Sequence, residues 1–153
     1  MTAHVDTFCR DNMPPRDQWP DFLRLPYPER LNCGTALLDD TIARYGADRL
    51  ALRTDAEQWT YGDLLATANR IAHVLAEDLD VVPGNRVLLR APNTPWLVAC
   101  WFAVMKAGAV AVTTMPLLRA GELATIVDKA AVSLALCDHR LLDELREIGR
   151  AHV

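Results

Sequence analysis

The sequence lacks the glycine-rich loops with which many folds bind phosphate. Its 153 residues include seven glycines, and no two of them are closer than twelve positions apart. A Gly-x-Gly-x-x-Gly fingerprint and a Walker-type phosphate loop are therefore absent, and so is the Gly-x-Ser-x-Gly elbow of α/β hydrolases. We accordingly assign no catalytic residue, and no motif in the chain itself predicts a bound cofactor.

Cysteine and histidine are also sparse and irregularly placed. The four cysteines form no Cys-x-x-Cys pair, and none of the four histidines stands at metal-ligand spacing from another ligand. This pattern predicts neither a disulfide framework nor a zinc site, so we expect no metal. Two of the cysteines, Cys100 and Cys137, lie within apolar runs and are expected to behave as small buried hydrophobes.

Charge and hydropathy exclude two classes of partner. The net charge is −4, and the chain has no basic run or arginine stripe, which argues against a nucleic-acid interface. The longest apolar run, residues 96–105, is too short to cross a bilayer, so no membrane contact is expected. Residues 1–16 include Asp6, Arg10 and Asp11 and hold no apolar core of a signal peptide, which predicts a cytoplasmic location.

A βαβ unit is predicted between Arg86 and Pro116. The apolar run at 86–90 lies between two charged residues and has the length of one buried strand. Thr94 is suited to the N-cap of the following helix, whose first residue is a proline that needs no N–H partner. Residues 96–105 are apolar all round, which predicts a helix buried on every side.

The end of this helix and the next strand follow from three short signals. Lys106 lies in the last turn, where its charge suits the negative end of the helix dipole. Gly108 suits the left-handed position just beyond the helix. Residues 109–113 then form a second β-type run, which Pro116 ends.

The rest of the chain continues the α/β alternation. Five of the nine prolines fall within residues 1–31, with aromatic residues between them, and predict an extended arm pinned by its rings. Residues 32–153 are predicted to form one α/β unit: a parallel sheet of βαβ units with helices on both faces, preceded by a small hairpin. The expected elements are a helix at 32–46, a hairpin at 50–53 and 58–60, a helix from Thr60 to near Leu79, a helix through 123–130, a strand at 132–137 and a helix from Leu141.

Polar residues follow each predicted strand, and ligands of open α/β sheets bind at the carboxyl ends of strands. Asn93 follows the first strand, Thr113 and Thr114 end the second, and Asp138 and His139 follow the third. These side chains are candidates for ligand contact, with helix capping by Asn93, Thr94 and Asp138 as the alternative. Two further acidic pairs, Asp39–Asp40 and Asp143–Glu144, lie in amphipathic helices and are expected on solvated faces, with general acid/base chemistry as the alternative.

Two segments resemble core motifs of the AMP-forming adenylate ligases, the family of acyl- and aryl-CoA synthetases. Residues 58–64 (Gln-Trp-Thr-Tyr-Gly-Asp-Leu) resemble the first motif, and residues 105–112 (Met-Lys-Ala-Gly-Ala-Val-Ala-Val) resemble the second. Residues 8–15, 114–119 and 135–140 are similar to 2-aminobenzoate–CoA ligases and their aromatic-acid relatives.

The resemblance implies an ATP-dependent reaction in two steps. A carboxylate attacks the α-phosphate of ATP–Mg to give an acyl-adenylate and pyrophosphate, and the thiol of coenzyme A then displaces AMP. The implied substrates are a small aromatic carboxylate, such as 2-aminobenzoate or benzoate, and coenzyme A. Arg119, just beyond a strand end, is the candidate for contact with the coenzyme A phosphates, with a solvated arginine at a helix start as the alternative.

The resemblance also implies that the chain is incomplete. The family's phosphate loop and C-terminal catalytic lysine have no counterpart here, and Lys106 and Lys129 are the only lysines. We therefore expect the first part of a large N-terminal AMP-binding domain, ending before the phosphate loop, inactive alone and prone to self-association. The alternatives are a free-standing α/β binding module without catalysis and an unrelated small flavodoxin-like domain.

Overall fold

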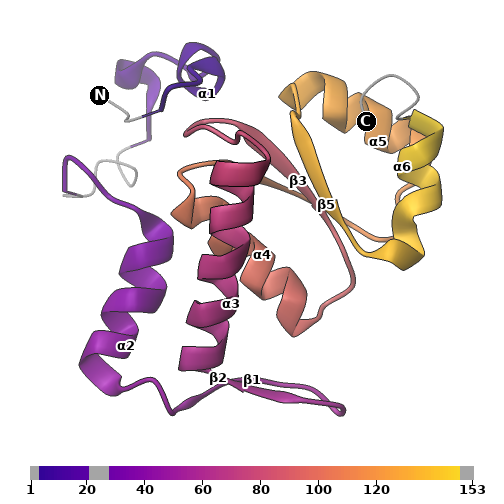
Figure 1. The fold of residues 1–153 in the computed structure, drawn as a ribbon. Helices are drawn as coiled ribbons and strands as arrows, with labels where there is room; N and C mark the ends of the chain where they lie inside the picture. The colour runs from indigo at the N-terminus through magenta and orange to yellow at the C-terminus, as the bar shows by residue number, and fades with distance from the viewer. Residues whose placement is uncertain (1–3, 21–27, 149–153) are drawn as a thin grey trace.

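A three-stranded parallel sheet organises the part of the chain that the computed structural model describes, residues 4–20 and 28–148 (Figure 1). Strand β3 (Arg86–Arg90) lies between β4 (Val110–Thr114) and β5 (Leu134–Cys137), and both pairings are parallel. The three strands predicted from the sequence are confirmed to within two residues. All five residues of β3 are buried, as expected for a central parallel strand covered on both faces.

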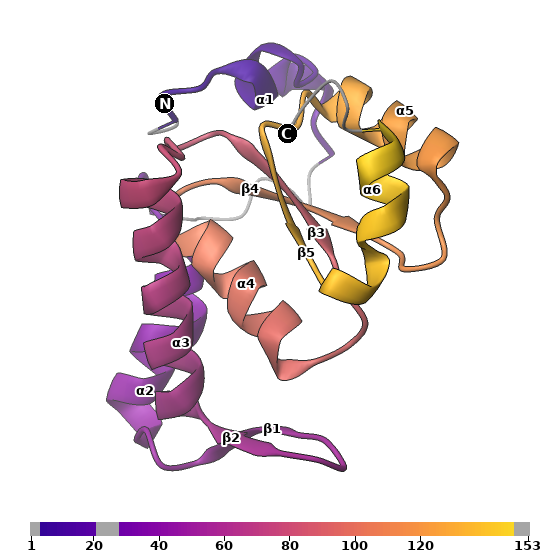
Figure 2. The ribbon, with the colours of Figure 1, turned by 45° about the vertical axis from the view of Figure 1, so that its right-hand side comes forward.

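Helices cover both faces of the sheet, which confirms the predicted fold class (Figure 2). On one face, α3 (Tyr61–His73) and α4 (Pro95–Lys106) contact Val87 and Leu89 of the central strand. On the other face lie α5 (Ala120–Ala130) and α6 (Leu142–Ile148), which follows the short 3-10 helix η5 (His139–Leu141). The alternation of side chains along β3 sends its two arginines toward this second face.

A second cluster of buried residues joins the N-terminal helices to α3 and α4. A π-helical turn, η3 (Thr35–Asp39), runs into α2 (Asp40–Tyr45), and α3 ends in a similar turn, η4 (Val74–Asp78). Leu38 and Ala99 are fully buried in this cluster. The Lys106 ammonium lies 2.5 Å from the Asp39 carboxylate, so this predicted last-turn lysine also pairs with the preceding helix.

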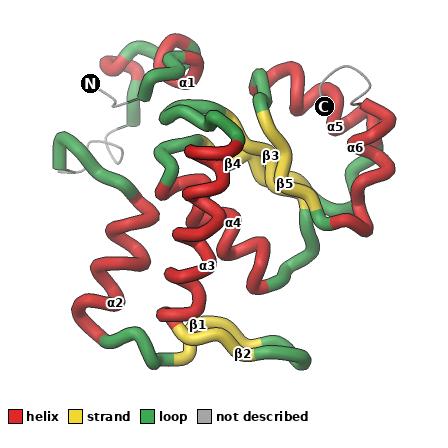
Figure 3. Tube along the Cα trace, viewed as in Figure 1, coloured by secondary structure: helices red, strands yellow, loops and turns green. Residues whose placement is uncertain are grey.

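The predicted hairpin is confirmed and lies apart from the parallel sheet. Strands β1 (Leu50–Arg53) and β2 (Gln58–Thr60) pair antiparallel beside the first turn of α3 (Figure 3). Thr60 begins that helix through the predicted capping box, in which its hydroxyl accepts from the Asp63 N–H at 3.1 Å. The hairpin is therefore tied directly to the start of a core helix.

The prediction that the apolar helix α4 is buried on every side is wrong. Its small residues Ala99 and Ala103 face the core and are fully buried, whereas Trp96 in the first turn is 55% exposed. The Trp96 ring meets Trp59 of the hairpin edge to face, with ring centroids 5.3 Å apart. The small side chains allow close packing on one side, and the bulky aromatic residue at the margin is left partly in solvent.

The structure tests the predicted burial of two cysteines and the predicted left-handed conformation of Gly108. Cys100 and Cys137 are only partly buried, and burial raises the pKa of both thiols. Gly108 follows α4 with φ +73°, which confirms the predicted left-handed helix stop. A Cβ there would lie 3.1 Å from Pro83 Cβ, so the position is both left-handed and crowded.

The described part of the N-terminal arm is not extended throughout. It forms a four-residue helix, α1 (Phe8–Asp11), and a 3-10 turn, η1 (Arg16–Gln18). Of the rings expected to pin the arm, Trp19 donates to the Pro14 carbonyl at 2.9 Å, within the arm itself. The other two, Phe22 and Tyr27, lie outside the described residues.

Asp6 and Phe8 attach the arm to the amino end of β3. The Arg86 guanidinium is bonded to the Asp6 carboxylate, and its carbon lies 4.6 Å from the centre of the Phe8 ring. Asp6 also accepts from the Phe8 N–H at 3.0 Å and from the Asn85 amide at 2.9 Å. The Phe8 N–H and the Arg86 guanidinium are the main causes that lower the pKa of Asp6 to about 2.

Gly108→Val is expected to destabilise the chain strongly, whereas Gly121→Ala is expected to be neutral or mildly stabilising. Left-handed geometry costs a branched residue about 1–2 kcal/mol even before the Pro83 contact is counted, so the urea midpoint should fall by roughly 1 M. At Gly121, inside α5, an added Cβ meets nothing within 4 Å. Urea unfolding of both variants measures this, and equal midpoints would contradict the assigned helix stop.

The attachment of the arm is expected to weaken in acid. Because the folded pKa of Asp6 is depressed, its carboxylate stabilises the fold above about pH 4, and that contribution is lost as pH falls toward 2. Between pH 5 and 2, the free energy of unfolding should therefore fall less for Asp6→Asn than for the unmodified chain. Urea unfolding at several pH values tests this, and parallel pH profiles would show that Asp6 is not attached as described.

The chain is expected to self-associate through the side of β5 that pairs with no other strand of the described residues. An apolar groove of about 690 Å³ lies beside this edge strand, lined by Leu134, Leu142 and Leu145 among others, and free edges promote pairing between molecules. Light scattering over a concentration series should show association that Ala135→Lys on β5, beside the groove, reduces more than Thr113→Lys on β4, the other edge strand. A 17.0 kDa monomer at every concentration would refute the expectation.

Candidate functional site

The carboxyl ends of the three strands meet at one edge of the sheet, as the sequence predicts. Thr114, Arg90 and Cys137 are register partners and form a row across this edge. The loops that leave it carry the other candidates, Asn93 and Asp138. In parallel α/β sheets this edge is where ligands bind, so it is the candidate site.

The centre of the edge is a buried guanidinium. Arg90 is 1% exposed and contacts backbone oxygens instead of a carboxylate. Its Nη1 donates to the Met115 carbonyl at 2.9 Å, and its Nη2 donates to the carbonyls of Pro116 and Leu118 at 3.0 and 2.9 Å. Its Nε donates to the Leu141 carbonyl at 3.3 Å. One side chain thus joins the loop after β4 to the turn after β5.

Arg119 lies directly after this loop, at the N-cap position of α5. Its side chain is 81% exposed, and its Nη1 donates to Glu144 of α6 at 2.7 Å. Glu144 also accepts from the Ala120 N–H at 2.8 Å. The Arg119 guanidinium is the main cause that lowers the pKa of the Glu144 carboxyl. The candidate arginine is therefore exposed to solvent and held by a partner on the neighbouring helix.

Asp138 acts as the cap of the following turn. Its carboxylate accepts from the Arg140 backbone N–H at 3.0 Å and from the Arg140 guanidinium at 2.7 Å, and these contacts hold its pKa well below the usual range. His139 beside it is 86% exposed, with its Nδ1 3.6 Å from Asp138. The structure thus places Asp138 in local capping contacts, the alternative weighed for it from the sequence.

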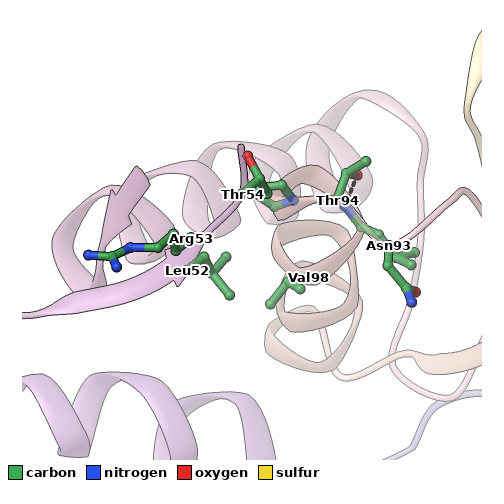
Figure 4. A pocket seen from close by; sticks show the side chains of 8 residues that line it. Leu52, Arg53, Thr54, Asn93, Thr94 and Val98 are labelled. Carbon is green, nitrogen blue, oxygen red and sulfur yellow. Dashed lines mark hydrogen bonds between the residues drawn. The ribbon is translucent and has the colours of Figure 1, made fainter. Parts of the chain in front are cut away.

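Asn93 and Thr94 lie on the wall of a small hollow beside the hairpin (Figure 4). Thr94 caps α4, since its hydroxyl accepts from the Leu97 N–H at 3.3 Å, while the Asn93 side chain is exposed. The hollow has a volume of about 250 Å³ and is mainly apolar, with Leu52 and Val98 opposite each other. It flanks the sheet edge and is separate from the Arg90 cluster.

The two acidic pairs are divided between solvent and ion pairs. Asp40 and Asp143 are exposed, as expected for solvated faces, and Asp143 also lies 3.5 Å from the Arg146 guanidinium. Their neighbours Asp39 and Glu144 instead bind Lys106 and Arg119, which makes that expectation wrong for one member of each pair. The other end-of-strand candidates are also accounted for: the Thr114 hydroxyl donates to the Leu89 carbonyl at 3.1 Å, and Thr113 is exposed.

Arg90 is the residue of this site that sequence reasoning missed. From the sequence it is a charge that bounds an apolar strand, and a boundary charge is normally expected in solvent. Its position as the last residue of a strand predicted to be covered on both faces was the available signal. A charge there must find hydrogen-bond acceptors inside the protein.

Of the cofactors that the resemblance implies, ATP–Mg does not fit the described residues, whereas coenzyme A fits at one contact. Among residues 4–20 and 28–148, no three of His, Cys, Asp and Glu gather into a group able to hold a metal ion. Together with the absent glycine-rich loop, this donor set does not fit ATP–Mg. An exposed guanidinium suits a phosphate, so Arg119 fits one contact to coenzyme A. In the same part of the chain, no helix is long and apolar enough to cross a bilayer.

A parallel sheet covered by helices on both faces, with its polar loops at the strand carboxyl ends, defines an α/β ligand-binding domain. Comparison with known families makes the class specific: the model of the AMP-binding enzyme family matches residues 38–152. The chain belongs to this family of AMP-binding enzymes.

Curated relatives are similar to most of the chain and include a synthetase and a CoA ligase. The chain is 34% identical over 137 residues to triostin synthetase I of Streptomyces triostinicus, covering 86% of this chain and 26% of the relative. It is 33% identical over 119 residues to the crotonobetaine/carnitine–CoA ligase of Salmonella paratyphi A, covering 74% and 23%. The chain thus spans about a quarter of the length of these relatives.

Solved structures share the fold. The anthranilate CoA ligase AuaEII, in complex with anthranoyl-AMP, superposes with a TM-score of 0.74 at 24% identity. The superposition covers 80% of this chain and 23% of that one. At this identity the likeness concerns the fold, and it agrees with the position of the chain in the family.

Proposed function

We propose that the chain is the first part of an AMP-forming aryl-CoA ligase, which joins an aromatic carboxylate to coenzyme A with ATP as the energy source. Residues 1–31 form the arm, and residues 32–153 begin the large AMP-binding domain, ahead of its phosphate loop. Membership of the AMP-binding enzyme family is the single observation that carries the proposal. The cytoplasm, which supplies ATP and coenzyme A, is the proposed location.

The aromatic substrate class is supported by sequence likeness. The arm at residues 8–15 and the segments 114–119 and 135–140 resemble 2-aminobenzoate–CoA ligases, and the last two flank the sheet edge of the candidate site. The fold likeness to an anthranilate CoA ligase is consistent with this class. The proposed acid is therefore 2-aminobenzoate or benzoate.

Arg119 is the proposed contact for the phosphates of coenzyme A. Its guanidinium is 81% exposed at the carboxyl edge of the sheet and keeps free N–H groups beyond the one that Glu144 accepts. No catalytic residue is proposed in this chain, because none of its described polar groups forms a nucleophile–base or metal arrangement.

The 153-residue chain by itself is expected to form no acyl-adenylate, because it offers no set of donors for the charge that develops on the α-phosphate. ATP–pyrophosphate exchange with 2-aminobenzoate and benzoate measures this, with heat-treated protein as the control. Exchange above that control would contradict the proposal that this chain lacks the groups needed to form an acyl-adenylate.

Extending the coding sequence past Val153 tests the function itself. A glycine-rich Ser/Thr loop encoded within a few tens of residues, and exchange by the extended product that depends on aromatic acids, would support an aryl-CoA ligase. Exchange with aliphatic acids alone would refute the aromatic class. An authentic stop codon would favour the free-standing binding module.

A further inference from the structure

We propose that Arg90 is a positioning residue: it fixes the loop of residues 115–118 and thereby holds Arg119 where its guanidinium meets the phosphates of coenzyme A. The inference rests on the proposed function, since it takes coenzyme A as the ligand of Arg119. It assigns to Arg90 a role in ligand binding without any contact to the ligand.

The Arg90 guanidinium is hydrogen-bonded mainly to the loop of residues 115–118. Three of its four acceptors, the carbonyls of Met115, Pro116 and Leu118, belong to one short loop and lie within 3.0 Å of the donating nitrogens. A guanidinium is planar and rigid, so bonds to three oxygens of one loop fix both the path and the tilt of that loop. The fourth bond, to Leu141, connects the same group to the turn after β5.

Hydrogen bonds continue without a break from this loop to the candidate contact. The Leu118 N–H donates to the Met115 carbonyl at 3.2 Å, and the Arg119 N–H donates to the Glu122 carboxylate at 3.0 Å. The Ala120 N–H then donates to Glu144 at 2.8 Å. Three consecutive amides are therefore hydrogen-bonded, which couples the backbone of Arg119 to the loop.

The side chains of the loop do not account for its order. Met115 is 62% exposed and Leu117 is 81% exposed, and the other two side chains of the loop, Pro116 and Leu118, are only partly buried. Loops with few buried contacts open locally at low free energy unless other bonds hold them. The buried guanidinium supplies those bonds, and the ordered loop presents two apolar side chains and one cation to solvent.

Arg86 offers a matched control within the same strand. It is 6% exposed, and its guanidinium donates to the carbonyls of Gly84, Ala130 and Ala131, at the opposite end of the sheet from Arg119. Lysine in place of either arginine keeps the charge but loses the planar fork. Both substitutions should lower stability, and only the one at Arg90 should affect the loop.

The experiment compares the 153-residue chain with its Arg90→Lys, Arg86→Lys and Arg119→Ala variants. Hydrogen-exchange mass spectrometry follows the peptide that spans residues 115–122, and ligand-observed ³¹P NMR measures binding of adenosine 3′,5′-bisphosphate, which carries the terminal phosphates of coenzyme A. Arg90→Lys should speed exchange of the peptide roughly tenfold and weaken bisphosphate binding roughly fivefold. Arg86→Lys should leave both within about twofold of the unmodified chain even where its urea midpoint falls.

Arg119→Ala separates ligand contact from loop order. It should remove most bisphosphate binding while the peptide exchanges at its original rate. Equal exchange and binding in the Arg90 and Arg86 variants would overturn the positioning role, because both changes would then be global. If the unmodified chain does not bind the bisphosphate, the proposed contact of Arg119 with coenzyme A is refuted, and so is the role of Arg90 in ligand binding. The hydrogen-exchange data would still show whether Arg90 orders the loop.

Discussion

A buried positive charge that pairs with no carboxylate among residues 4–20 and 28–148 is the constraint on which the carboxyl edge of this sheet depends. Removing a charge from water costs several kcal/mol even in a relaxed protein interior. For Arg90 this cost is offset by four carbonyl oxygens, each bond from a charged donor contributing about 1.5–3 kcal/mol. The loop after β4 and the turn after β5 must both supply these oxygens, so their positions are set by the guanidinium.

At the amino edge of the sheet, a second buried arginine donates to backbone carbonyls and also binds the N-terminal arm. Arg86 also donates to backbone carbonyls, but it adds a carboxylate, Asp6, and an aromatic face, Phe8. Both partners come from the N-terminal arm, so this arginine attaches the arm to the sheet. One strand with an arginine at each end therefore organises the arm at one edge and the candidate site at the other.

This arrangement leaves one arginine, Arg119, exposed at the carboxyl edge of the sheet although the net charge of the chain is negative. Arg90 is fully covered by the loop that it orders, and Arg119 at the end of that loop is the exposed cation. The carboxylates nearby are engaged: Glu144 binds Arg119, and Asp138 binds Arg140. Under the proposed function, a phosphate of coenzyme A would bind at the Arg119 guanidinium, beside the Glu144 carboxylate. The chain spans about a quarter of the length of its relatives.

Much of the architecture could be predicted from sequence because local signals agreed with one another. The apolar runs of β3, β4 and β5, the capping box at Thr60 and the left-handed glycine at 108 each depend on short-range chemistry, and each was found where it was expected. Tertiary structure alone decided which charges were buried and which apolar residues were exposed. Arg90 is buried and Trp96 is partly exposed because burial depends on which other segments pack against a residue. For Arg90, the carbonyls that accept its hydrogen bonds lie from 25 to 51 positions away in the sequence.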